Sequence, residues 1–141
     1  GKFEGGKILD AIADKMQKGK KAVATYAAEK VGIPREDIEW ATELGKQWGD
    51  RAVVNGRGDA ARHLALGWLA QKSSTPKAAK FAVDFREGFN SRPMVKHMDL
   101  TNNQLGFEMQ AENKAEAVRQ INDMVNSGKA MTITADEANS Y

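Results

Sequence analysis

One stretch near the middle of the chain decides the fold class: Asp59-Ala-Ala-Arg-His-Leu-Ala-Leu-Gly-Trp-Leu69. It is rich in apolar residues, and Leu64 and Trp68 lie one helical turn apart, which predicts a helix with a buried face. An Asn55-Gly56 turn precedes it. We expect Asp59 to cap the helix and the helix to stop near Ser73.

The same periodicity runs through most of the chain. It predicts helices over residues 7–31, 34–49, 59–73, 76–89, 101–111 and 113–128, with a loop at 90–98. Gly32, Gly49 and Gly128 are expected to end helices, and Asn113 with Glu116 to form a capping box. The sequence therefore predicts an all-α fold, a single compact bundle of about six helices formed by residues 1–141 as one domain. Within it, residues 1–57 form an N-terminal helical pair, residues 58–128 carry the polar motifs, and residues 129–141 form an extended tail.

Length and composition exclude several classes of protein. With 141 residues, 41% hydrophobic and 28% charged, the chain has the composition of one globular domain. Its apolar runs fall far short of the roughly 20 residues that cross a bilayer. The lack of cysteine excludes a disulfide scaffold, a thiolate nucleophile and an iron–sulfur cluster. The chain begins at Gly1 without Met or an apolar signal segment, so we expect a processed product or a fragment of a longer protein.

The charge balance does not favour a nucleic-acid partner, because 21 basic and 19 acidic residues leave a net charge of only +2. The densest basic run consists of Lys15, Lys18, Lys20 and Lys21. Such a run can contact anionic lipid at a membrane surface. More often it is the solvated face of a helix, and we favour that interpretation.

The first polar grouping lies on the central helix itself. Asp59, Arg62 and His63 are spaced i, i+3 and i+4, so their side chains share one face. A carboxylate one turn from an imidazole can fix its tautomer and raise its basicity, as a general base requires. The alternative is that Asp59 is only a cap and His63 a half-buried residue with its hydrogen bonds satisfied.

A second grouping, Asp84-Phe-Arg-Glu87, lies on the next predicted helix. Asp84 and Glu87 share a face, with Phe81, Phe85 and Phe89 as apolar neighbours. An apolar wall raises the pKa of a carboxylate beside it, which suits a general acid. The alternative is a surface carboxylate that pairs with Arg86 or Lys80.

The third grouping is Met98-Asp-Leu-Thr-Asn-Asn-Gln-Leu-Gly106. Asp99 is expected to cap a helix, with Asn102 and Asn103 in its first turn. Adjacent asparagines are poor helix formers, but their amides can hold a substrate carbonyl or carboxylate. Cap and turn chemistry explains the same residues equally well.

Together the three groupings resemble an uncharacterised bacterial and phage domain family with Asp-x-x-Arg-His and Met-Asp-Leu-x-Asn-Asn-x-x-Gly motifs. That family recurs in secreted or wall-associated proteins and near the C-termini of polymorphic-toxin-like chains. The likeness covers residues 58–109, and it places the family's polar positions at Asp59, Arg62, His63, Glu87, Asp99, Asn102 and Asn103. This chain departs from the family pattern in having Arg86 where the family usually has a histidine, and Leu66 where it usually has an aromatic residue.

No metal or cofactor is predicted. His63, Glu87, Asp99 and His97 are of ligand type, but they match no known ligand spacing. The missing second histidine argues against a two-histidine metal site. The chain also lacks a Gly-x-Ser-x-Gly turn and a phosphate-binding loop.

Two hypotheses for the function follow. In the first, the chain is a toxin-like or phage-encoded hydrolase acting on a cell-envelope or other anionic substrate. His63 would be the general base, oriented by Asp59, and Glu87 the general acid. The substrate-binding residues would be Arg62, Asp99, Asn102 and Asn103. In the second, the same groups form a structural network in a non-catalytic interaction or virion-associated module. An immunity or virion protein is the expected partner, and a secreted, cell-envelope or virion location is favoured over the cytoplasm.

Overall fold

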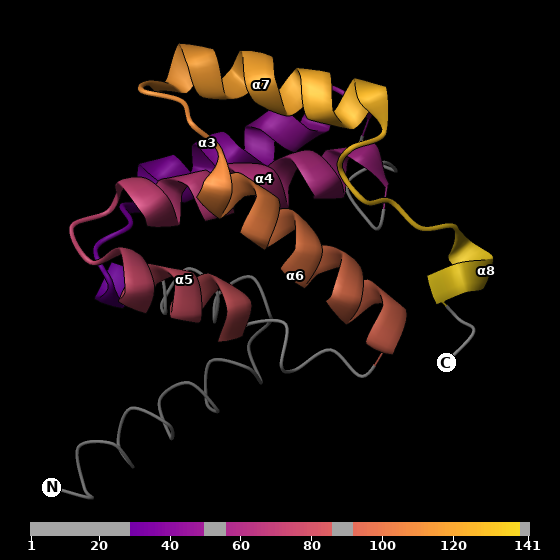
Figure 1. The fold of residues 1–141 in the computed structure, drawn as a ribbon, viewed down its shortest axis with the longest axis horizontal. Helices are drawn as coiled ribbons and strands as arrows, with labels where there is room; N and C mark the ends of the chain where they lie inside the picture. The colour runs from indigo at the N-terminus through magenta and orange to yellow at the C-terminus, as the bar shows by residue number, and fades with distance from the viewer. Residues whose placement is uncertain (1–28, 50–55, 86–91, 139–141) are drawn as a thin grey trace, which may run out of the picture.

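The computed structural model describes residues 29–49, 56–85 and 92–138, and the secondary structure of these residues is entirely helical. Five helices have ten or more residues, and α8 is a single turn (Figure 1). The elements in chain order are α3 (Arg35–Lys46), α4 (Arg57–Lys72), α5 (Pro76–Phe85), α6 (Pro93–Glu108), α7 (Lys114–Ser127) and α8 (Ala135–Ala138). The predicted all-α compact fold is confirmed, although the count of about six helices is slightly off. The predicted helix at 7–31 and the lysine run at 15–21 lie almost entirely outside the described residues.

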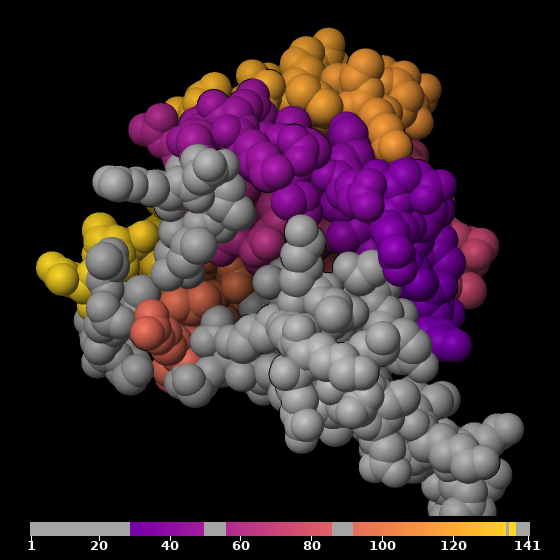
Figure 2. Space-filling view, turned by 180° about the vertical axis from the view of Figure 1, so that it is seen from behind, coloured from indigo at the N-terminus to yellow at the C-terminus, as the bar shows by residue number. Residues whose placement is uncertain are grey.

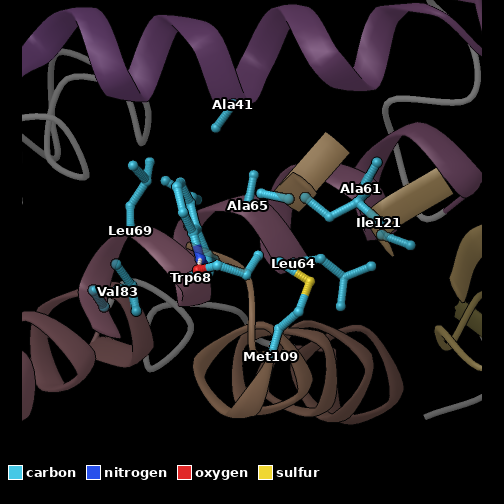
Figure 3. Close-up of a cluster of buried hydrophobic side chains, with 14 of the residues drawn as sticks. Ala41, Ala61, Leu64, Ala65, Trp68, Leu69, Val83, Met109 and Ile121 are labelled. Atoms are coloured by element: carbon cyan, nitrogen blue, oxygen red, sulfur yellow. Dashed lines mark hydrogen bonds between the residues drawn. The ribbon is translucent and has the colours of Figure 1, made fainter. Parts of the chain in front are cut away.

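Helix α4 is the centre of the bundle. It contacts α3, α5, α6 and α7, and most of its residues are buried all around its circumference (Figure 1). Leu64, Ala65 and Trp68 belong to the main core, which Ala41 enters from α3 and Ile121 from α7 (Figure 3). Burying one large aliphatic side chain contributes about 1.5–3 kcal/mol, so this shared core supplies most of the stability.

Glycines set how closely the helices approach α4. A Cβ atom on Gly67 would lie 2.0 Å from the carbonyl oxygen of Asn103, and a Cβ on Gly106 would lie 2.0 Å from that of Leu64. Both distances are far below van der Waals contact, so α4 and α6 touch backbone to backbone at this crossing. Gly45 of α3 approaches Gly58 of α4 in the same way, since a Cβ atom on Gly45 would lie 2.5 Å from the carbonyl oxygen of Gly58. Any larger residue at these positions would force the helices apart.

The predicted helix ends are confirmed at several points. Gly32 and Gly128 adopt the left-handed conformation, with φ of 87° and 81°. The Asn113 side chain accepts a hydrogen bond from the backbone N–H of Glu116, and the Glu116 carboxylate accepts one from the backbone N–H of Glu112. A capping box therefore begins α7, as predicted.

Two predicted caps are wrong. Helix α4 begins at Arg57, so Asp59 lies inside its first turn, and the cap position belongs to Gly56. Helix α6 begins at Pro93 rather than near Thr101, so residues 93–98 are helical, and Asp99 lies well inside the helix. The reason is Pro93, whose fixed φ suits the first position of a helix and which loses no hydrogen bond there. Because neither aspartate caps its own helix, both side chains can point toward the neighbouring helix.

In the tail after α7, residues 129–134 form neither helix nor strand, and the single turn α8 follows them within the predicted tail 129–141. It packs on α6 through a small second core of Val95, Met98 and Ile133. Asn102 holds it in place: its Nδ2 donates to the carbonyl of Met131, and its Oδ1 accepts from the N–H of Met131, both at 2.8 Å. The tail therefore adds to the packing of α6 without forming a strand.

Seen from behind, α3 covers much of the upper face, with α7 above it (Figure 2).

None of the described helices has the length and the apolar character needed to cross a membrane.

Candidate functional site

Four polar side chains meet in the buried interface between α4 and α6. His63 Nε2 lies 3.5 Å from Asp59 Oδ1 and 3.2 Å from Asp99 Oδ1, and His63 Nδ1 lies 2.8 Å from Asn103 Oδ1. None of the four residues is more than 4% exposed. We call Asp59, His63, Asp99 and Asn103 the polar cluster.

The cluster follows from helical spacing and from the glycine crossing. Asp59 and His63 are four residues apart on α4, and Asp99 and Asn103 are four apart on α6, so each pair shares a face. Gly67 comes one turn after His63, and Gly106 comes three residues after Asn103. Because the helices touch at these glycines, the polar residues one turn earlier are brought within hydrogen-bonding distance.

The side chain of Asn103 fixes the tautomer of His63. Asn103 Nδ2 donates to the carbonyl of Val83 at 3.3 Å and to Asp84 Oδ1 at 3.1 Å, so its Oδ1 must face the imidazole. A carbonyl oxygen only accepts, and therefore Nδ1 of His63 carries a proton and donates it to Asn103. In the neutral ring, Nε2 is left with a lone pair, and the two carboxylate oxygens lie 3.2 and 3.5 Å from it.

Arg62 lies at the edge of the cluster. Its Nη2 donates to Asp59 Oδ1, and its side chain is 19% exposed. Its buried Nε makes no hydrogen bond within the described part of the chain. The predicted meeting of Asp59, Arg62 and His63 on one face is thus confirmed, with Arg62 reaching from the cluster toward the surface.

Asp84 extends the network to α5. It accepts hydrogen bonds from Asn103 and, at 2.6 Å, from Lys80 Nζ. Pairing with Lys80 was one of the alternatives open for this carboxylate, and it is confirmed. The predicted general acid Glu87, together with Arg86 and Phe89, lies outside the described residues.

Two residues considered for the site lie away from the cluster. Asn102 uses its amide to hold Met131 of the tail, so it does not join its neighbour Asn103. His97 is exposed on α6, whereas Asp99 two residues later is buried. Adjacent residues on a helix point in different directions, which is why sequence proximity misled here.

The cluster contains atoms suited to bind a proton or a metal ion. One ligand atom each from Asp59, His63 and Asp99 can be chosen so that all three lie within 4.8 Å of one another. A neutral imidazole and two carboxylates are bases and good ligands, and Arg62 adds a positive charge beside them.

Sequence reasoning missed the link through Asp84 and the role of Gly67, although a glycine four residues after His63 is a usable signal of close helix approach.

A family model described as "Domain of unknown function (DUF6973)" matches residues 35–132, so the chain belongs to this family. The match runs from α3 through α7 into the tail, which is wider than the motif-bearing stretch 58–109. No curated protein and no solved structure matches the chain.

Proposed function

We propose that this member of the DUF6973 family is a hydrolase whose water-activating centre is the polar cluster. The observation that carries the proposal is the arrangement of His63. Its Nδ1 is hydrogen-bonded to Asn103 at 2.8 Å, and its Nε2 lies 3.5 and 3.2 Å from carboxylate oxygens of Asp59 and Asp99. A buried imidazole held in one tautomer by a second residue is what a general base needs.

The chemistry follows from that arrangement. Nε2 of neutral His63 takes a proton from a water molecule, and the two carboxylates stabilise the imidazolium that forms. Asn103 keeps the ring oriented throughout, because its amide is itself held by Val83 and Asp84. The water, having lost its proton, attacks the substrate bond. Glu87 keeps its predicted role as the acid that protonates the leaving group.

The class of substrate rests on two further points. The guanidinium of Arg62 has a buried Nε–H that makes no hydrogen bond in the described part of the chain, which suits an anionic group at the edge of the cluster. The resemblance to domains of secreted, wall-associated and polymorphic-toxin-like proteins favours a cell-envelope substrate. A toxin-like or phage-encoded origin and a secreted, envelope or virion location belong to the same proposal.

The experiment compares His63→Gln with His97→Ala, because the chain has two histidines and only His63 lies in the cluster. Hydrolysis of labelled cell-wall and phospholipid preparations is measured, together with growth inhibition when the chain is exported. We expect His63→Gln to lose activity by about 10²–10⁴-fold, as when a general base is removed, and His97→Ala to keep it. Circular dichroism verifies that both variants are folded. A folded His63→Gln variant with full activity would contradict the proposal.

A non-catalytic helical module is the second candidate, and the burial of the cluster is the observation that favours it. Polar groups exposed by 4% or less are typical of networks that lock one packing arrangement. In that case breaking one partner costs about 3–5 kcal/mol, because a charge is left buried without compensation. The stability of Asp99→Asn, considered in the Discussion, separates the two candidates.

A further inference from the structure

We propose that Asp59, His63 and Asp99 bind a divalent transition-metal cation of the zinc class, with a fourth position left for water. The inference concerns the same site as the proposed hydrolase and rests on that proposal only for the reaction. With a cation bound, the lone pair of His63 Nε2 is a ligand, so the cation and not the imidazole would activate the water. Binding of the cation is a separate property and is tested separately.

The first argument is the environment of Nε2. It is buried in a residue that is 1% exposed, and it makes no hydrogen bond within the described residues. Asp99 Oδ1 is only 3.2 Å away but is not aligned to accept a hydrogen bond from the ring. A proton on Nε2 would therefore serve neither carboxylate well. A cation between the three atoms would use the lone pair of the nitrogen and would be held by one oxygen of each carboxylate.

The second argument is the spacing of the atoms. Zinc lies about 2.0–2.2 Å from nitrogen and oxygen ligands, so a tetrahedral site holds neighbouring ligand atoms about 3.3–3.6 Å apart. The two nitrogen–oxygen distances here are 3.2 and 3.5 Å. An octahedral magnesium site, with ligands at about 2.0–2.1 Å, would need spacings of only about 3 Å. Two of the three ligand spacings are thus close to those of a tetrahedral site, and the carboxylate oxygens of the set lie within 4.8 Å of one another.

The third argument is the support around the imidazole. A metal-bound histidine usually donates its other ring N–H to a carbonyl or carboxylate, which fixes the tautomer and the ring orientation. His63 does this through Nδ1 to Asn103, and Asn103 is in turn held by Val83 and Asp84. A histidine that only supports the fold does not need one residue to orient its ring and further residues to hold that one in place.

Ligand type and charge select the class of cation. An imidazole nitrogen favours zinc, iron, copper or nickel over magnesium or calcium. The two carboxylates carry negative charge that a divalent cation would balance, and Arg62 is paired with Asp59 beside them. A zinc-bound water has a pKa of about 7, so the cation would make that water reactive at neutral pH.

The test uses the full 141-residue chain, tag-free and stripped with EDTA. Zn²⁺ is titrated by calorimetry, and Co²⁺ is added as a probe whose visible absorption distinguishes tetrahedral from octahedral coordination. We expect one Zn²⁺ per chain, a raised unfolding temperature in its presence, and a tetrahedral Co²⁺ spectrum. The lack of cysteine removes thiolates as competing ligands.

Ligand variants and matched surface controls assign the site. Asp99→Asn keeps the shape of the side chain and should weaken Zn²⁺ binding at least about 100-fold, as should His63→Gln. Asn103→Ala, which removes only the support for the imidazole, should weaken it about 10–100-fold. The exposed His97→Ala and Asp123→Asn controls should bind as the unchanged chain does.

The outcomes separate this inference from the proposed hydrolase. Zn²⁺ binding that is lost in Asp99→Asn supports the inference whether or not hydrolysis is detected. A folded chain that takes up neither Zn²⁺ nor Co²⁺ overturns it, as does uptake that survives in both ligand variants or is lost in His97→Ala. Hydrolysis that persists at full rate in EDTA leaves a hydrolase but removes any role for the cation in its reaction.

Discussion

The two sides of α4 are built on different principles. Toward α3 and α7 the contacts are apolar: Ala41 and Ile121 pack on it, and the rings of Trp40 and Trp68 lie 5.8 Å apart. Glycines bring α4 close to α3 as well as to α6, but on the α6 side the interface also holds the buried charged and amide groups of the polar cluster. Apolar burial stabilises a fold without further conditions, whereas buried carboxylates stabilise it only when something compensates their charge. The α6 side therefore holds the groups on which both proposed functions depend.

The largest effect is expected at the crossing itself. A Cβ on Gly106 would lie 2.0 Å from the carbonyl oxygen of Leu64, and backbone cannot move aside as a flexible side chain can. Gly106→Ala should lower the free energy of unfolding by about 3 kcal/mol or more, at the upper end of overpacking effects. Urea denaturation measures this, with Gln104→Ala on the exposed face of α6 as a control expected to stay within about 0.5 kcal/mol. Equal stability of the two variants would mean that the helices do not touch as described.

A somewhat smaller effect is expected on the apolar side. Ile121 is fully buried in the main core. Ile121→Ala removes three carbon atoms and leaves a cavity, which should cost about 2–4 kcal/mol. The half-buried Val118→Ala on the same helix should cost about 1 kcal/mol or less. Ile121 packs in the apolar core and is not a member of the polar cluster. Its loss should therefore leave the Zn²⁺ affinity, and any hydrolysis by the folded fraction, unchanged.

The smallest effect on stability, and the most informative, is expected for Asp99→Asn in the EDTA-treated chain. Replacing one of two carboxylates beside Nε2 relieves their repulsion and supplies an N–H donor for the lone pair. We expect no loss of stability and a gain of up to about 1 kcal/mol, as at sites whose charges serve function rather than folding. Thermal unfolding with and without EDTA measures it. A loss of about 3–5 kcal/mol would instead favour the structural network of the second candidate.

The sequence predicted the helical class and most helix ends because these depend on local chemistry. Gly32 and Gly128 end helices through backbone conformations that glycine adopts freely, and Asn113 and Glu116 bond to backbone groups three or four residues away. The start of α6 was placed too late because Ser91, Arg92 and Pro93 are typical of a loop, although residues 94–98 after them are helical. Their helical conformation is favoured by the packing of Val95 and Met98 against the tail.

The candidate site was predicted only in part, for a related reason. Asp59, Arg62 and His63 could be placed on one face from their spacing, since that face is a property of a single helix. The separation of Asn102 from Asn103 could not, because one amide meets the tail and the other meets α4. The link from Asn103 to Asp84 also required three helices to be placed in space.

The sequence by itself determined that the chain forms helices, where most of them end, and which polar residues lie on a common helical face. These are short-range consequences of periodicity, caps and glycine. The tertiary structure alone decided that the Asp59–His63 face of α4 meets the Asp99–Asn103 face of α6. That meeting depends on the close backbone approach of Gly67 to Asn103 and of Gly106 to Leu64, and no local rule specifies the partner of such a contact.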